Sequence, residues 1–449
     1  MTKDMTKGSP ARLIIRFAIP VLAGMLFQQM YNLVDTMIVG RTLGVQALAG
    51  VGATGSINFL VLGFCMGVCS GFAIPVAQCF GAGERERMRE YEANAIYLAA
   101  AFSVVITGVT VLACRQILRA MGTPEDCFEE AYRYISVIFA GIPFMVLYNL
   151  CSGFLRSLGD SRTPLVFLII SSVLNVVLDL TLILVFRMGI MGASLATVIS
   201  QAISGLLCLL WIIRKVPMLH ISGQQWKAKR ERMAVLCNSG IPMGLQYSIT
   251  AIGSVILQTA VNSLGSLAVA AMTASIKVLN FLACPFDALG STMATYGAQN
   301  VGAGHYDRLN KGLFASSLMG FVYSVGAFLV AMFGGRMLTQ LFVSSGGEEL
   351  VRLAHQYMVM QVAFYPLLTL VNVVRFTIQG MGFSIFAIIA GVLEMIARSL
   401  TGIFLVPVLG FDGVTLGSPL AWILADVFLI PAYFHCKKRL MGKVHHAKI

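Results

Sequence analysis

Polar side chains inside long apolar segments are the residues of this sequence that could do chemistry. Asn175 and Asp179 are four apart, so a helix would carry both on one face. Asp35 and Thr197 lie in other apolar segments, and at 1.5 Å per residue Asp35, Asp179 and Thr197 lie about 6–10 Å from the outer ends of their segments, so the four side chains reach a similar depth. Two carboxyl groups, an amide and a hydroxyl suit a hard cation or a shared proton. We therefore expect a cation-coupling site here; the alternative is that Asp35 caps a helix end and Asn175 only packs between helices.

The elements that carry these residues are membrane-spanning helices. The chain has 449 residues, of which 57% are apolar and 12% charged, and its mean hydropathy is +0.82. Soluble proteins have about 45–50% apolar and about 25% charged residues. A helix needs about 20 mainly apolar residues to cross a bilayer, and the sequence holds twelve such segments between residues 13 and 436. These numbers predict an all-α polytopic membrane protein with twelve transmembrane helices and exclude a soluble one.

The sequence divides into two similar halves. A polar stretch at 214–232 separates six apolar segments from six more, and we expect an N-terminal six-helix lobe at 1–215, a cytoplasmic loop at 216–232 and a C-terminal six-helix lobe at 233–449. The motif Gln78-x-x-Gly81-Ala82-Gly83 recurs 221 residues later as Gln299-x-x-Gly302-Ala303-Gly304. Ile19-Pro20 recurs as Ile241-Pro242, and a proline inside a helix kinks it. Parallel repeats of this kind predict a central cavity and alternating access.

Lysine and arginine predict the orientation in the membrane. With the N-terminus inside the cell, 22 of the 32 Lys and Arg residues fall on cytoplasmic segments, as the positive-inside rule requires. We therefore expect a multi-pass protein of the cell membrane with both termini in the cytoplasm. The same bias explains the formal net charge of +12, so we expect no nucleic-acid partner.

The second half does not repeat the pair formed by Asn175 and Asp179. The aligned positions are Glu394 and Arg398, which are four apart and can neutralise each other. We interpret them as a structural clasp, with substrate contact as the alternative.

Three further ionisable residues lie in apolar segments of the second half. Lys277 and Asp287 are ten residues apart, too far along one helix to pair directly, so either is a candidate for facing the cavity. Asp426 comes late in the last segment, and we expect it near the cytoplasmic surface.

With these motifs, the chain resembles the multidrug and toxic compound extrusion (MATE) family. The resemblance covers almost the whole chain, and its motifs are Asn32-x-x-Asp35-x-x-x-Val39-Gly40-x-x-Leu43-Gly44, Gln78-x-x-Gly81-Ala82-Gly83, Arg156-x-x-Gly159-Asp160 and Asn175-x-x-x-Asp179. It implies a V-shaped pair of six-helix lobes that export cationic or amphipathic drugs in exchange for inward H⁺ or Na⁺, with no other cofactor or metal. The residues that it implies for cation coupling are again Asp35, Asn175, Asp179 and Thr197. Pro20 matches the proline at which the first helix bends in some relatives.

The chain departs from one branch of that family. NorM-like members keep a glutamate in the seventh span, whereas residues 238–265 contain no acid, and Gln246 and Thr250 are the polar candidates there. The departure favours coupling in the N-terminal half.

The same residues bear on two other functions, that of a lipid flippase and that of a membrane enzyme. A flippase for a lipid-linked precursor would need a cationic cavity for phosphate, for which Lys277, Arg375 and Arg398 are a modest supply. A membrane enzyme would need clustered His, Cys or carboxylate residues, but the histidines are scattered and the sequence has no P-loop. We expect a monomeric transporter of small organic cations and amphipathic drugs, not an enzyme.

Overall fold

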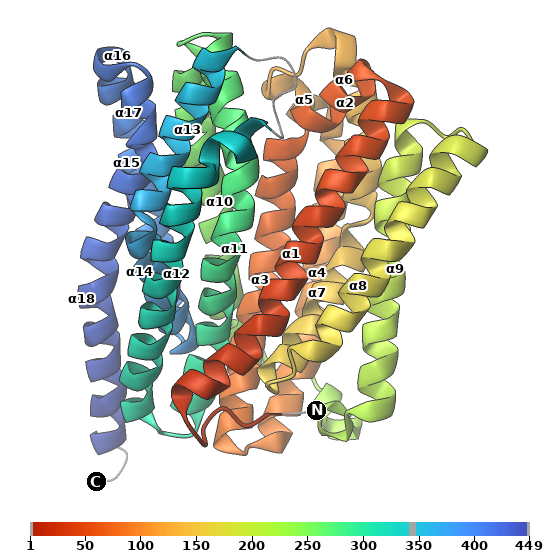
Figure 1. Cartoon of the computed structure of the whole chain (residues 1–449). Helices are drawn as coiled ribbons and strands as arrows, with labels where there is room; N and C mark the ends of the chain where they lie inside the picture. The colour runs from red at the N-terminus through yellow and green to blue at the C-terminus, as the bar shows by residue number, and fades with distance from the viewer. Residues whose placement is uncertain (1–2, 341–346, 447–449) are drawn as a thin grey trace. The chain divides into compact units, whose positions relative to one another are not determined.

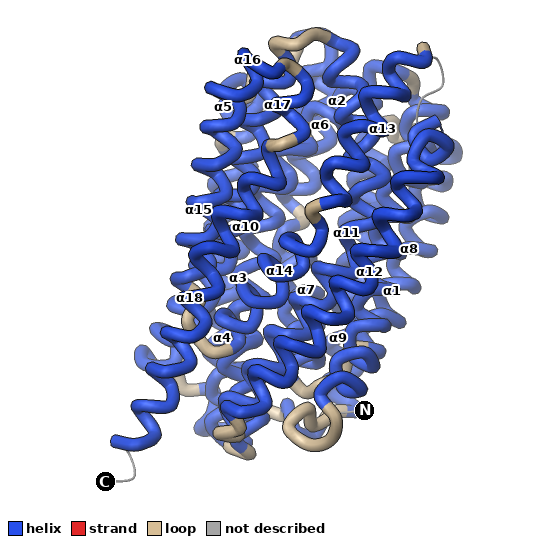
Figure 2. Tube along the Cα trace, turned by 60° about the vertical axis from the view of Figure 1, so that its left-hand side comes forward, coloured by secondary structure: helices blue, strands red, loops and turns tan. Residues whose placement is uncertain are grey.

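The computed structural model describes residues 3–340 and 347–446, and every regular element among them is a helix (Figures 1 and 2). Ten of these helices are long and apolar enough to cross a membrane, and two bent pairs bring the spans within the described residues to as many as twelve. The predicted all-α polytopic architecture is confirmed.

Two spans are bent where a proline starts the second helix of the pair. α6 (Glu125–Ala140) and α7 (Ile142–Ser157) meet at 46°, and α13 (Glu348–Ala363) and α14 (Tyr365–Gly380) meet at 49°. Proline lacks the N–H that would continue the preceding helix, but it is well suited to a first helical turn. The two bends therefore follow from a proline at the same place in each half.

The chain forms two compact units, which are described separately. The first contains Met1–Asp4 and Ala23–Gly244, and the second contains Met5–Leu22 and Leu245–Ile449. Two helices, α1 (Pro10–Leu43) and α10 (Arg230–Asn262), are shared between the units. Each changes unit two residues after a proline, namely Pro20 in α1 and Pro242 in α10. The repeated Ile-Pro sequence thus marks equivalent positions in the two halves.

The first unit is built around α3, α4, α7 and α9, whose buried apolar side chains include Phe72, Leu150 and Cys208. The elements of this unit follow in chain order, apart from α6 and α7, whose bounds are given above. The bounds are α2 (Val45–Ala53), α3 (Gly55–Ala82), α4 (Arg85–Leu112), α5 (Cys114–Ala120), α8 (Arg162–Leu180), a π-helix (Thr181–Val185), α9 (Ile190–Lys215) and two short 3₁₀ turns (Pro217–Leu219 and Gly223–Trp226).

The second unit has its core around Phe286, whose ring lies 5.3 Å from that of Tyr323 and 5.0 Å from that of Tyr365. These aromatic contacts join α11, α12 and α14. The bounds are α11 (Ser266–Gly302), α12 (Tyr306–Gln340), α15 (Ile385–Leu400), a π-helix (Thr401–Leu405), α16 (Val406–Leu409), α17 (Phe411–Thr415) and α18 (Gly417–His446).

A glycine seam, formed by Gly67 and Gly71 of α3 with Gly240 and Gly244 of α10, holds the start of α10 in the first unit. A Cβ atom on Gly71 would lie 2.4 Å from the Cα atom of Gly240, and one on Gly67 would lie 2.5 Å from the carbonyl oxygen of Met243. Both pairs have the G-x-x-x-G spacing that lets two membrane helices approach closely. Only glycine fits at this crossing.

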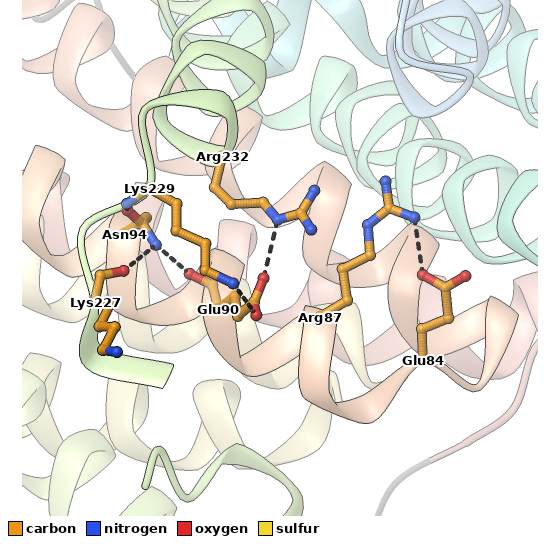
Figure 3. Close-up of polar contacts among 7 residues, drawn as sticks. All are labelled: Glu84, Arg87, Glu90, Asn94, Lys227, Lys229 and Arg232. Carbon is orange, nitrogen blue, oxygen red and sulfur yellow. Dashed lines mark hydrogen bonds and ion pairs between the residues drawn. The ribbon is translucent and has the colours of Figure 1, made fainter. Parts of the chain in front are cut away.

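The predicted loop at 216–232 is anchored to α4 through Glu90 and Asn94 (Figure 3). Glu90 forms ion pairs with Lys229 and, at 3.1 Å, with Arg232. Asn94 accepts a hydrogen bond from the backbone N–H of Lys229 at 2.9 Å, and its amide nitrogen lies 3.5 Å from the carbonyl oxygen of Lys227. One helical turn of α4 therefore fixes both the end of the loop and the start of α10.

The middle of this loop is also held by α4. Arg89 donates to the carbonyl oxygens of Met218 and Pro217 at 3.0 and 3.1 Å. The Tyr97 hydroxyl donates to the carbonyl oxygen of Trp226 at 2.9 Å, and the two rings meet edge to face. The loop is thus an ordered part of the first unit.

Candidate functional site

The four residues predicted to bind a cation come together in the first unit. Asp35 lies in α1, Asn175 and Asp179 in α8, and Thr197 in α9 (Figure 1). All four are buried, with exposed fractions between 0% for Asp179 and 8% for Thr197. The proximity expected of these four residues is therefore present, and their role in cation coupling stays a prediction.

The side-chain amide of Asn175 connects the two helices. Its nitrogen lies 3.4 Å from the Thr197 hydroxyl. With the amide turned over, the nitrogen donates to Oδ2 of Asp179 at 3.0 Å and the oxygen accepts from the backbone N–H of Thr197 at 3.2 Å. The turned amide satisfies both of its ends, so Asn175 orients the Asp179 carboxyl toward the neighbouring helices.

The carboxyl groups of Asp35 and Asp179 lie close enough to share a hydrogen bond. A carboxylate has no proton to donate, so this bond requires that one of the two groups is protonated. The Oδ1 atom of each group is buried and has no hydrogen-bond partner in the described part of the chain. Buried oxygens of this kind are costly unless they are satisfied, and they fit a small hard cation or a proton equally well by their chemistry.

Two tyrosines that the sequence analysis missed surround this pair. The Tyr31 hydroxyl hydrogen-bonds to Thr197, and Tyr134 of α6 lies close enough to interact electrostatically with Asp35. Tyr31 precedes Asp35 by four residues, so the helical spacing could have revealed it. No spacing rule connects Tyr134 with the other residues, because its position depends on how α6 packs.

A π-helix follows the site residues directly. Thr181–Val185 begins two residues after Asp179, and in the second unit Thr401–Leu405 begins three residues after Arg398. Each starts with a threonine whose hydroxyl donates to the carbonyl oxygen four residues earlier, at 2.7 and 2.8 Å. Such short π segments are frequent at functional positions in helices, and both halves of this chain have one at the equivalent place.

The predicted pair of Glu394 and Arg398 is present in the second unit, at 3.5 Å. Glu394 also forms a closer ion pair with Arg375 of α14. The Glu394 carboxylate therefore lies between two arginines. The i, i+4 spacing could reveal Arg398 but not Arg375.

The other polar residues named from the sequence have different surroundings. Gln246 is buried and accepts a hydrogen bond from Gln379 at 2.5 Å. Lys277 and Asp287 are exposed on α11. Asp426 is 4% exposed and interacts electrostatically with Arg375, and its expected place near the cytoplasmic surface stays a prediction.

The sequence and structure were compared with known proteins. The MatE family model matches residues 20–181 and 242–404, which is more than half of the chain. Its two stretches begin at Pro20 and Pro242, so the family model repeats as the motifs do.

Relatives cover most of the chain. It is 29% identical to the probable multidrug resistance protein YoeA of Bacillus subtilis, over 97% of this chain and 95% of that protein. It is 24% identical to a FAD transporter of Shewanella oneidensis, over 79% of each. A solved MOP superfamily transporter from Pyrococcus furiosus superposes with a TM-score of 0.90 at 22% identity, over 98% of this chain and 99% of that one.

Proposed function

The chain belongs to the MatE family of multi-pass multidrug efflux transporters, which are not enzymes, and from this premise we propose that it is a secondary antiporter. It exports cationic or amphipathic compounds in exchange for an inward-moving H⁺ or Na⁺. The distribution of Lys and Arg supports a cell-membrane orientation with both termini in the cytoplasm, and we propose that the monomer is the working unit.

The close approach of the Asp35 and Asp179 carboxyl groups is the observation on which this proposal depends. With one proton the pair is stable out of water; without it, two carboxylates repel each other in a medium of low dielectric constant. The deprotonated state therefore needs another conformation or another cation. This difference couples the occupancy of the site to a conformational change.

A hydrogen bond between these carboxyl groups would require one proton, which favours H⁺ as the coupling ion. Na⁺ would need ionised carboxylates as oxygen ligands, with both aspartates turned toward the ion. We propose that a proton on the pair is exchanged for one cationic substrate, and that Na⁺ is the competing ion to be tested.

The experiment is efflux of ethidium from proteoliposomes under an imposed pH gradient or, separately, an imposed Na⁺ gradient. The proposal predicts efflux driven by the pH gradient and its loss in Asp179→Asn. Asp307→Asn is the matched control, because Asp307 is an exposed acid at the start of α12 that forms an ion pair with Lys311, at 3.7 Å. Efflux driven by neither gradient would overturn the antiport proposal, and efflux driven by Na⁺ alone would overturn the choice of ion.

A second candidate is export of an anionic amphipathic compound. It is supported by the relative named as a FAD transporter and by Lys277, which is exposed on α11. Efflux of entrapped FAD, followed by its own fluorescence, tests this candidate. It requires that Lys277→Gln slows FAD efflux while ethidium efflux is unchanged; equal effects on both would exclude a separate anionic function.

A further inference from the structure

The second unit contains a buried charged cluster, defined as Arg375, Glu394, Arg398 and Asp426, that the proposed coupling pair does not use. The four residues come from α14, α15 and α18, and their exposed fractions are 3–7%. Charges at such depth are costly and are retained where they have a function. The charges of these four residues must therefore balance within the protein. Asp287 takes part in this balance because it interacts electrostatically with Arg375.

Polar atoms of this cluster are incompletely paired. Glu394 contacts both arginines, but Nε of Arg375 and Nη1 of Arg398 have no hydrogen-bond partner within the described residues. Both carboxyl oxygens of Asp426 are likewise buried and unpartnered there, although Asp426 interacts electrostatically with Arg375. A carboxyl group in this situation is stable out of water as the neutral acid.

A second acid competes with Asp426 for the charge of Arg375. Besides its ion-pair partner Glu394, the groups that interact electrostatically with this guanidinium are Arg398 of α15, Asp426 of α18, Tyr247 of α10 and Asp287 of α11. Asp287 differs from Asp426 because it is exposed on α11. Glu394 and one further carboxylate balance two arginines, so the cluster needs either Asp287 or Asp426 ionised, but not both.

We propose that Asp287 is the contact for an organic cation and that Asp426 is a second proton-binding site linked to it through Arg375. While Asp287 is free of substrate, its charge balances Arg375 and Asp426 keeps its proton. A cation that neutralises Asp287 withdraws that balance, and Asp426 then releases its proton to water and becomes the counter-ion of Arg375. Substrate binding and proton binding are thus opposed in the second unit, as antiport requires.

This inference rests on the proposed antiport, but its first test needs neither substrate nor transport. The C=O stretching band of protonated carboxyl groups is recorded by infrared spectroscopy of the purified protein as the pH is raised. The proposal predicts that Asp426→Asn removes one titrating component, which Asp307→Asn retains. It also predicts that Asp287→Asn shifts that component to lower pH by about one unit, because Arg375 then has only Asp426 to balance it.

The exposed position of Asp287 keeps the test valid if Asp426→Asn does not fold. A component that is unchanged in Asp287→Asn would overturn the linkage, and a spectrum of Asp426→Asn identical to the wild type would overturn the proton site. Proton release on adding ethidium, measured with a pH indicator in weakly buffered detergent solution, is the second readout. The release from Asp426 should persist in Asp179→Asn, so failure of the first-unit coupling site and failure of this proposal give different results.

Discussion

At the scale of single residues, Asn175 has the clearest structural task. Its amide connects the Asp179 carboxyl to Thr197 across two helices. We expect Asn175→Ala to destabilise the protein by about 1–3 kcal/mol, because it leaves a buried carboxyl oxygen without its donor. The measurement is the thermal unfolding temperature in detergent together with pH-driven ethidium efflux.

Asn149→Ala is the matched control for this change, since the Asn149 amide bonds only to the carbonyl oxygen of Met145 in its own helix, at 2.9 Å. A loss of efflux in Asn175→Ala no larger than in Asn149→Ala would contradict the role given to this amide.

Asp160 caps the helix that carries the site and makes its stability depend on pH. Burial alone would raise the pKa of Asp160, but hydrogen bonds from the Thr163 hydroxyl at 2.7 Å and from the first backbone N–H groups of α8 at 3.1 Å lower it below the ordinary value. A lowered pKa means that the ionised group stabilises the folded state above about pH 4, and that this contribution is lost as the pH falls through the folded-state pKa.

We therefore expect Asp160→Ala to cost about 0.5–2 kcal/mol at neutral pH and less in acid. Unfolding temperatures measured at neutral and at acid pH check this, and Asp160→Asn, which keeps an acceptor for the helix N–H groups, should recover most of the loss. An Asp160→Ala effect that is the same at both pH values would rule out the charge as its cause.

At the scale of elements, the glycine seam predicts a strong effect of one methyl group. In Gly71→Ala the added Cβ would meet the backbone of Gly240 at 2.4 Å, and neither atom can move without moving its helix. We expect a loss of several degrees or more in the unfolding temperature, typical of overpacking costs of about 1–3 kcal/mol.

Gly326→Ala is the control for the seam, because a Cβ at this helical position of α12 meets nothing within 4 Å. Alanine should be tolerated there or should stabilise the helix. Equal unfolding temperatures for the two variants would show that α3 and α10 do not approach as closely as described.

The anchored loop gives a prediction for proteolysis. Glu90→Gln weakens the ion pairs with Lys229 and Arg232, so trypsin should cleave after Lys227 and Lys229 several times faster than in the wild type. Glu84→Gln is the control, because Glu84 pairs at 3.0 Å with Arg87 on its own side of the helix and not with the loop (Figure 3). Unchanged cleavage in Glu90→Gln would mean that the other contacts of α4 suffice to hold the loop.

At the scale of the whole molecule, helix number, the repeat and the four-residue site could be predicted from the sequence. Hydropathy and the i, i+4 spacing are local properties, and they were enough to place Asn175 beside Asp179 and Glu394 beside Arg398. Tyr134 and Arg375 could not be predicted, because their positions depend on packing between helices that are distant in sequence.

The central claim is that the carboxyl pair exchanges a proton for substrate. The most direct measurement is the internal pH of proteoliposomes with an entrapped pH dye when ethidium is added outside. Antiport predicts that ethidium entry drives protons out, so the lumen of wild-type vesicles becomes alkaline and the lumen of Asp179→Asn vesicles does not. Ethidium entry with no change in internal pH, or an equal change in both proteins, would contradict the account.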